Sequence, residues 1–177
     1  MSEGGTRAHF EQTLFEQTML PHLDAAYNLA RWITRNEQDA EDIVQEAYLR
    51  AFRYFASFTG GDGKAWLLTI VRNTCLTWHR QKRAGAVEFD ERIHMVSEEP
   101  AAQEAALLRE ADLSLLRDCM DALPVEYRET LAMRELEEMS YKAIAEVTAL
   151  PIGTVMSRLS RGRKRLEDCM AAKGDKA

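Results

Sequence analysis

Apolar residues recur at helical spacing along nearly the whole chain of 177 residues. The first clear segment follows Pro21, and its apolar residues obey the i, i+3, i+7 rule of an amphipathic helix. They are Leu23, Ala26, Ala30 and Ile33. Alternation of β-branched and polar residues, which marks strands, is nearly absent. The pattern therefore predicts an all-α protein.

Two more helices are expected in the N-terminal half. Asp39 suits the N-cap of a helix that runs to about Phe55. Its inner face is expected to be apolar and to consist of Ile43, Val44, Ala47, Ala51, Tyr54 and Phe55. A Gly-rich loop over 57–63 then leads to a third helix from about Lys64 to Arg83.

Residues 84–100 lack helical periodicity, and helices are expected again from Ala101 onward. The Ala- and Leu-rich run that begins there predicts a long helix. Pro124 suits the start of the next one, because its fixed φ and missing N–H are tolerated in a first helical turn. Two helices should follow, over 140–149 and 151–170.

The charges indicate a division into two domains. The chain carries 23 Lys and Arg against 29 Asp and Glu, a formal net charge of −6, which alone argues against nucleic-acid binding. Residues 1–84 hold 10 acids and 10 bases, residues 113–177 hold 11 of each, and residues 85–112 hold 8 acids and 2 bases. We therefore expect two small, neutral helical domains over 8–84 and 113–171, joined by a flexible acidic linker over 85–112.

Composition excludes several classes of protein. Hydrophobic residues make up 46% of the chain, too many for a disordered protein. No apolar run approaches the roughly 20 residues of a membrane span, and no secretory signal is visible, so a cytoplasmic location is expected. Cys75, Cys119 and Cys169 are far apart and odd in number. They are interpreted as small buried residues, with a pair or metal site built across domains left open.

The clearest motif is a helix-turn-helix over 140–166. Ser140 is a suitable N-cap, a turn is expected over 148–150, and Pro151 starts the second helix. Small Ala145 and Gly153 are expected to let the two helices cross closely.

The second helix of this motif separates into two faces. The apolar face should pack inward and consists of Val155, Leu159, Gly162 and Leu166. The opposite face carries hydroxyls and guanidinium groups, which suit the major groove of DNA; its residues are Thr154, Ser157, Arg158, Arg161 and Arg165. Arg163 and Lys164 flank it and would favour phosphates. The alternative is a solvated basic helix end stabilised by the helix dipole.

The helix expected over 39–55 carries a second surface of interest. Opposite its apolar side lies a face that mixes carboxylates, an amide, Leu and Arg: Asp42, Gln45, Glu46, Leu49 and Arg53. Such a mixture fits a protein-docking surface, although an ordinary charged helix face is an equal alternative.

The next helix interleaves aromatic and cationic residues beside a Gly-rich loop. This combination suits a single nucleic-acid strand, because unstacked bases meet aromatic side chains while cations hold the phosphates. The candidate residues are Lys64, Arg72, Asn73, Thr77, Trp78, Arg80, Lys82 and Arg83. Trp66 is expected in the core, because it has helical spacing with Leu67 and Ile70.

Two sequence blocks resemble a known family. The string DAEDIVQEAYLRAF at 39–52, followed by GKAWLLTIVRNTCLTWHRQKR at 63–83, resembles region 2 of a bacterial sigma factor. The string LPVEYRETLAMRELEEMSYKAIAEVTALPIGTVMSRLSRGRKRL at 123–166 resembles its region 4. With these two regions and a short linker, the chain resembles the extracytoplasmic-function group of the sigma-70 family.

The resemblance implies an RNA polymerase sigma factor that directs core polymerase to promoters with −35 and −10 elements. Such a factor would have no catalytic residues, cofactor or metal of its own. The set Asp39, Asp42, Gln45, Glu46, Leu49 and Arg53 would bind the clamp of the β′ subunit, and the C-terminal domain would also meet the β flap. The cationic face of 154–165 would read the −35 duplex, and the Lys64–Arg83 set the melted −10 strand. An anti-sigma factor is implied as a further partner, and the acidic linker would thread the polymerase's RNA-exit path.

One position departs from the family pattern. Met156 stands where relatives commonly carry Lys or Arg, and a thioether cannot make a charge-assisted contact with DNA. Reading of the −35 element is therefore expected to rely on Ser157, Arg158 and Arg161.

Two other classes of function are weighed. Asp39, Asp42 and Glu46 at helical spacing could hold Mg²⁺ in an all-helical phosphohydrolase, but the N-terminal half offers no second carboxylate cluster. A free-standing helix-turn-helix regulator would bind duplex DNA alone, but it has no use for residues 39–83. Both alternatives rank below the sigma factor.

Overall fold

The computed structural model describes residues 3–85 and 104–174, and in these ranges every regular element is helical. The N-terminal unit holds α1 (Glu3–Met19), η1 (Leu20–His22), α2 (Leu23–Thr34), α3 (Glu37–Tyr54), η2 (Phe55–Ser57) and α4 (Gly63–Gly85). The C-terminal unit holds α5 (Glu104–Ala122), α6 (Val125–Leu131), η3 (Ala132–Leu136), α7 (Tyr141–Thr148) and α8 (Ile152–Gly174). The all-α prediction is confirmed. No helix in the described ranges is long and apolar enough to cross a membrane.

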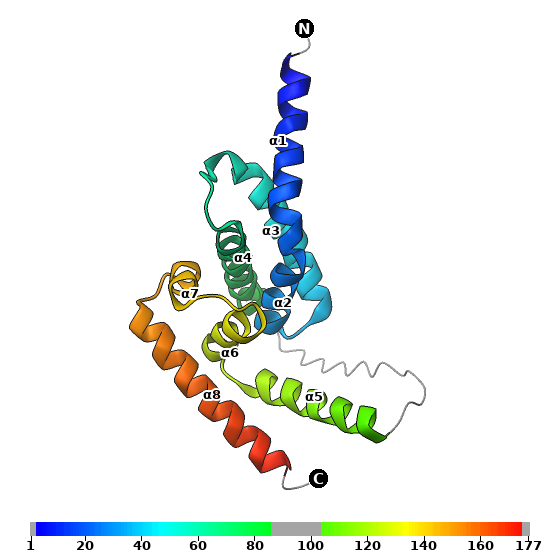
Figure 1. Ribbon diagram of the computed structural model, residues 1–177, viewed down its shortest axis with the longest axis vertical. Coiled ribbons are helices and arrows are strands. Elements are labelled where there is room, and N and C mark those ends of the chain that lie inside the picture. The colour runs from blue at the N-terminus through cyan, green and yellow to red at the C-terminus, as the bar shows by residue number, and fades with distance from the viewer. Residues whose placement is uncertain (1–2, 86–103, 175–177) are drawn as a thin grey trace.

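Helices α2, α3 and α4 pack against one another and form the core of the N-terminal unit. Leu29, Ile33, Ile43, Leu67 and Val71 are at most 2% exposed there. Helix α1 joins this core only through its last turns and projects from one end of the molecule, while α8 ends at the opposite end (Figure 1). Because so few residues of α1 are buried, its periodicity is weak, and no helix is predicted before Pro21.

The start of α3 differs from the prediction. The N-cap is Asn36, whose side-chain oxygen accepts a 2.9 Å hydrogen bond from the backbone N–H of Asp39. Asp39 is thus the third residue of the helix rather than its cap, because Asn36 has the extended backbone that a cap requires. The expected inner face holds for Ile43 and the residues that follow it, but Tyr54 is 63% exposed at the end of the helix.

In the C-terminal unit, α6 and α8 form the main contact, and α5 and α7 pack on either side. The helix after Pro124 changes to π-helical geometry over η3, where the backbone N–H of Glu137 bonds to the carbonyl of Ala132. Helix α5 begins at Glu104, inside the segment expected to be a linker. Residues 86–103, which make up most of the acidic linker predicted over 85–112, lie outside the described residues.

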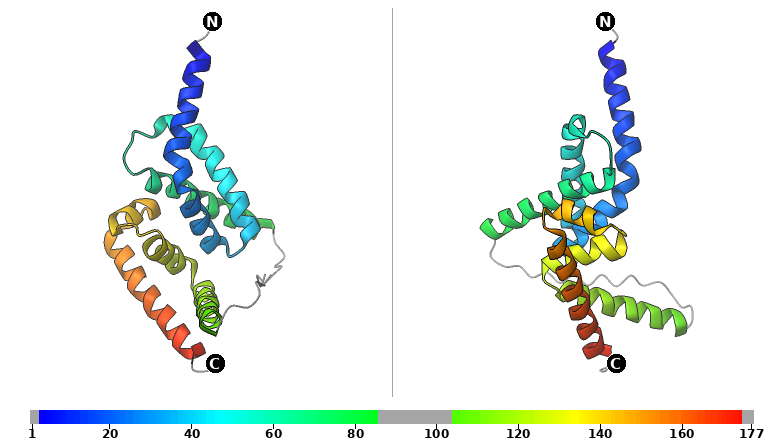
Figure 2. Two further views of the ribbon diagram at one scale, coloured as in Figure 1. Left: turned by 45° about the vertical axis from the view of Figure 1, so that its right-hand side comes forward. Right: turned by 60° about the vertical axis from the view of Figure 1, so that its left-hand side comes forward.

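The two units contact each other directly. Helix α7 packs against α4, and α6 packs against α2. The three views agree that α6 and α7 lie beside the N-terminal unit, whereas α5 and the end of α8 point away from it (Figures 1 and 2). This contact places acidic residues of one unit on the cationic helix of the other.

The cysteines depart from the prediction. Cys119 of α5 and Cys169 of α8 form a disulfide with their Cα atoms 5.8 Å apart, inside the C-terminal unit and not across the two units. The interpretation of these two as separate buried thiols is wrong, because the tertiary fold brings together positions 50 residues apart. Cys75 is a free, buried thiol as expected, and burial raises its pKa to about 12.

Candidate nucleic-acid interface

The helix-turn-helix forms where the sequence predicts it. The Ser140 hydroxyl accepts a 3.1 Å hydrogen bond from the Ala143 N–H and caps α7. Ala149 ends α7 in the left-handed conformation, with φ of 54°. Pro151 then begins the second helix by accepting hydrogen bonds from the N–H groups of Thr154 and Val155. These local bonds set the angle between the two helices of the motif.

The inward face of α8 is as predicted, but the close helix contact is not at Gly153. Val155 and Leu159 are at most 1% exposed, and Gly162 is buried. A Cβ atom at Gly162 would lie 3.1 Å from Cδ1 of Leu131, whereas one at Gly153 would meet nothing within 4 Å. Gly162 therefore permits the close crossing, and that crossing is with α6 and not with α7.

The polar residues of α8 differ in whether another side chain already contacts them. Arg161 is exposed and makes no ion pair in the part of the chain that the structure describes, and Arg165 lies over the ring of Tyr127 at 5.0 Å. Arg163 binds Glu135 at 2.6 Å, and exposed Lys164 lies 3.7 Å from Asp168. Exposed pairs of this kind contribute only about 0–1 kcal/mol, so phosphates could replace the carboxylates.

Two further candidates on α8 point partly into the protein. Arg158 is half-buried, with a nitrogen 3.5 Å from a carboxylate oxygen of Glu129. The hydroxyl of Ser157 donates to the carbonyl of Thr154 within its own helix at 3.0 Å. Among the arginines of this face, Arg161 is thus the one with neither an acid nor an aromatic ring beside it in the described residues.

On α4, two cations of the single-strand set bind acids of the C-terminal unit. Arg72, whose side chain is 15% exposed, makes two hydrogen bonds of 2.7 and 3.0 Å to the carboxylate of Glu129. The ammonium group of Lys64 lies 2.9 Å from the backbone carbonyl oxygen of Glu137 and 2.8 Å from a carboxylate oxygen of the same residue. In this arrangement both cations are paired with carboxylates and cannot bind phosphates at the same time.

The rest of the set lies further along α4. Asn73 and Arg80 are exposed, and the hydroxyl of Thr77 donates to the carbonyl of Asn73 at 3.0 Å. Lys82 lies 4.5 Å over the ring of half-buried Trp78 and 3.1 Å from Asp39. Arg83 is part of α4, but its side chain lies outside the described residues. Trp66 is partly buried and packs against the core, as predicted.

Glu129 is the residue that sequence reasoning missed. Its side chain is 4% exposed and contacts both Arg72 of α4 and Arg158 of α8. One buried carboxylate thus connects a candidate for single-strand binding with a candidate for duplex binding. Glu129 lies between polar Arg128 and Thr130, so the local sequence gives no signal that its carboxylate is buried or which residues it binds.

Its neighbour Arg128 is the second missed residue. The guanidinium is buried and donates to the carbonyls of Trp32 and Ile33 in the last turn of α2, and to those of Asp121 and Leu123. Burial, with the nearby charge of Arg35, lowers its pKa to about 10, so it stays charged at neutral pH. Arg128 therefore supplies the carbonyls at the end of α2 with donors from the other unit.

The candidate docking face lies along α3. Asp42, Gln45, Glu46, Leu49 and Arg53 are exposed, and Leu49 is 57% exposed. The exposed ring of Phe52, three residues after Leu49 on the same side of α3, extends this face beyond the predicted set. Asp39, the sixth candidate, is half-buried and paired with Lys82. A groove of about 120 Å³ separates α3 from α4, and its lining includes Asp42 and Glu46 as well as Thr77 and Trp78.

The carboxylates considered as a magnesium site do not converge on a common point. Asp39 is bound to Lys82, and Glu46 binds Arg50 at 2.7 Å. Among the described residues, no three His, Cys, Asp or Glu side chains come together in a way that could hold a metal ion. The geometry of α3 gives the phosphohydrolase alternative no support.

Comparisons with known proteins match both units. Residues 19–85 match the family model described as Sigma-70 region 2, and residues 113–166 match that of Sigma-70, region 4. The ECF RNA polymerase sigma-E factor of Haemophilus influenzae is 31% identical over 151 residues, covering 79% of this chain and 78% of that protein. The ECF RNA polymerase sigma factor SigE of Mycolicibacterium smegmatis is 29% identical over 160 residues, and the match covers 89% of this chain but 62% of that protein.

Solved structures give the same similarity. The sigma factor RpoE from Bartonella quintana, in complex with the anti-sigma factor NepR, matches with a TM-score of 0.74 and 26% identity, covering 89% of this chain and 96% of that one. CnrH, in complex with the cytosolic domain of CnrY, matches in fold with a TM-score of 0.65 and 23% identity, covering 91% of this chain and 90% of that one.

Proposed function

The chain belongs to the extracytoplasmic-function group of the sigma-70 family, and we propose on this basis that it directs core RNA polymerase to promoters with −35 and −10 elements. The observation that carries the proposal is the presence, in one chain, of a helix-turn-helix with a cationic face and a separate helical unit with an exposed docking face on α3. Catalysis belongs to the polymerase, and the chain supplies recognition. Its place of action is the bacterial cytoplasm.

The C-terminal unit reads the −35 duplex. Helix α8 enters the major groove with its exposed polar face, where Arg161 reaches a guanine or a phosphate and Arg163 and Lys164 exchange their carboxylates for phosphates. Met156 is 51% exposed on the same helix and offers an apolar contact, for example to a thymine methyl group.

The N-terminal unit holds core polymerase and traps the melted −10 strand. The β′ clamp docks on the exposed face of α3, and the bases meet Asn73, Trp78 and the loop that precedes α4. Each site alone binds weakly, and polymerase places both on one promoter so that they act together. We retain the division into 8–84, 85–112 and 113–171 for these roles, with α5 extending into the middle segment.

Promoter binding requires the two units to separate. Arg72 and Lys64 cannot meet phosphates while Glu129 and Glu137 hold them, and Arg158 shares Glu129. In the complex with core polymerase and promoter, these cations therefore release their carboxylate partners and bind DNA phosphates instead. The similar Bartonella quintana sigma factor is in complex with an anti-sigma factor. An anti-sigma factor that held the two units of this chain together would keep its DNA-binding residues occupied.

Run-off transcription with core polymerase on a promoter library tests the proposal. Transcripts should appear only when the chain is added, and the selected promoters should share two elements at fixed spacing. A gel shift with and without core separates the alternatives, because a sigma factor should need core for specific binding. Specific duplex binding by the chain alone, with no effect on transcription, would favour the free-standing regulator.

A further inference from the structure

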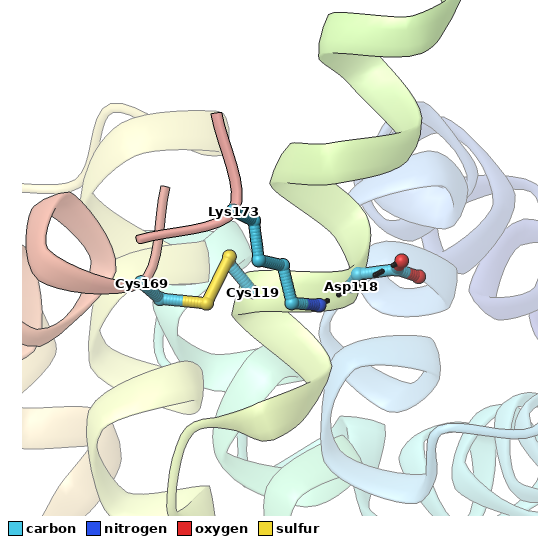
Figure 3. Close-up of a disulfide and its surroundings, with 4 residues drawn as sticks. All are labelled: Asp118, Cys119, Cys169 and Lys173. Carbon is cyan, nitrogen blue, oxygen red and sulfur yellow. Dashed lines mark ion pairs between the residues drawn. A yellow bond between two sulfur atoms is a disulfide. The ribbon is translucent and has the colours of Figure 1, made fainter. Parts of the chain in front are cut away.

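The end of the DNA-binding unit is held by a covalent and an ionic cross-link between the same two helices. Cys119 of α5 and Cys169 of α8 form the disulfide, and their Cα separation of 5.8 Å is in the ordinary range. Lys173 lies one turn beyond Cys169, and its ammonium group is 3.8 Å from the carboxylate of Asp118, the neighbour of Cys119 (Figure 3). The two bonds lie side by side.

Little else holds the last turns of α8. Leu166 is the last residue of the helix that packs partly against the core, and beyond it Glu167, Asp168 and residues 171–174 are exposed. Helix α5 is likewise exposed over 110–114 and is buried at its C-terminal end, at Cys119 and Met120. The disulfide therefore ties the largely exposed end of α8 to the buried C-terminal end of α5.

The bond also encloses the entire DNA-binding motif. Its sequence separation of 50 residues spans α6, η3, α7 and most of α8. Closing a loop of this length restricts the unfolded chain, and the folded unit gains stability relative to it. The cross-link lies beyond the polar face of α8 around Arg161, so it changes the stability of the unit without blocking that face.

We propose that Cys119 and Cys169 are a reversible redox site whose oxidation clamps α8 onto α5 and stabilises the helix-turn-helix unit. Half-buried Cys169 is the thiol that a small molecule reaches first, and buried Cys119 resolves it. The oxidant is a small-molecule disulfide such as oxidised glutathione.

The oxidation proceeds by two successive thiol–disulfide exchanges. The Cys169 thiolate attacks one sulfur of the small disulfide, which forms a mixed disulfide and releases one thiol after proton uptake. The Cys119 thiolate then attacks Sγ of Cys169, which forms the protein disulfide and releases the second thiol. Two cysteines lose two electrons and two protons, and the small disulfide gains them.

Cys75 provides an internal control. It is a free thiol, fully buried in the N-terminal unit, and should take no part in the exchange. Cys169→Ala removes the bond at a half-buried position, so the chain should still fold, and Cys75→Ala leaves the bond intact. Lys173→Ala removes only the ionic cross-link.

The test uses the full chain equilibrated in glutathione buffers from fully reduced to fully oxidised. Free thiols are then blocked with N-ethylmaleimide, and the modified cysteines are identified by peptide mass spectrometry. We expect Cys119 and Cys169 to lose modification together as oxidised glutathione rises. The thermal midpoint of the oxidised chain should exceed that of the reduced chain by on the order of 10 °C.

The variants show whether the Cys119–Cys169 bond causes the change in the thermal midpoint. The shift of the thermal midpoint should persist in Cys75→Ala and Lys173→Ala and vanish in Cys169→Ala. The proposal is overturned if Cys119 and Cys169 stay modified at every buffer ratio, if only a mixed disulfide with glutathione forms, or if the bond forms without raising the midpoint. None of these outcomes depends on transcription, so the proposed function is tested separately.

Discussion

At the scale of single residues, the cations of this protein are distinguished by their partners and not by their type. Arg158, Arg161 and Arg163 are close in sequence, yet the first binds buried Glu129, the third binds exposed Glu135, and Arg161 is exposed with no acid beside it among the described residues. A free guanidinium pays no cost of breaking an ion pair when it meets DNA. Arg161 should therefore contribute most to duplex recognition.

Arg161→Ala should weaken binding to the −35 element by about 5- to 100-fold, the worth of one good guanidinium contact with a base. Because the side chain is exposed, the thermal stability should not change. Fluorescence anisotropy of holoenzyme on promoter DNA measures the effect, and Arg117→Ala, at an exposed position of α5, is the matched control. Equal affinity of Arg161→Ala and wild-type holoenzyme for −35 DNA would contradict this role.

At the scale of elements, the packing of α8 requires glycine at one of its positions, Gly162, and not at another, Gly153. Gly162 lies against Leu131 and Tyr127 of α6, whereas Gly153 faces open space in the first turn of α8. A methyl group at Gly162 must displace a buried leucine side chain, and overpacking of this kind is destabilising. At Gly153 the same group fills no occupied space and favours the helix.

Gly162→Ala should lower the free energy of unfolding by about 1–3 kcal/mol, since Leu131 must shift. Gly153→Ala, the matched control, should leave it unchanged or raise it by up to about 1 kcal/mol. Urea unfolding followed by circular dichroism measures both. The packing assignment fails if the two variants are equally stable.

Helix α3 presents an exposed face whose alteration should affect polymerase and not the fold. Replacing Gln45 and Glu46 together with alanine keeps helix propensity high, so α3 should remain folded. Affinity for core polymerase should fall about 5-fold or more, as for loss of an interface contact worth over 1 kcal/mol. Surface plasmon resonance with immobilised core measures the affinity.

The control for α3 is the Glu16→Ala, Gln17→Ala double variant. These are the same residue types at exposed positions of α1. It should bind core like the wild type. Unchanged affinity of the Gln45, Glu46 variant would refute the docking role of α3.

At the scale of the whole molecule, polar contacts join the two units alongside an apolar cluster that contains residues of both. Glu129 binds Arg72, Glu137 binds Lys64, and Arg128 donates to the backbone of α2. When the units separate, water and phosphates can replace the partners that these polar groups lose. Two of the residues in these contacts, Arg72 and Lys64, are also proposed to bind DNA.

Glu129→Gln should loosen this interface, because the amide keeps the shape of the side chain but removes the charge that pairs with Arg72. We expect the free energy of unfolding to fall by about 1–3 kcal/mol and the radius of gyration to rise in small-angle scattering. Glu146→Gln makes the same change at an exposed position of α7 and should alter neither quantity. Identical scattering and stability of the Glu129 and Glu146 variants would show that Glu129 does not hold the units.

The sequence by itself determined the local features of this protein. The helical class, the cap at Ser140, the inward face of α8 and the polar face of α3 follow from spacing and side-chain chemistry, because each depends on residues within a few turns of one another. Even locally, the sequence favours Asp39 as the cap of α3, whereas the cap is Asn36, since several polar residues in a row can serve as caps.

The tertiary structure alone decided which distant residues meet. The Cys119–Cys169 bond, the burial of Glu129 between two arginines and the crossing at Gly162 join positions 29 to 57 residues apart. A charged side chain has many partners available along a sequence, and only the packing of helices selects one and excludes water from it. The choice between a cation open to DNA and one already bound therefore lies in the fold.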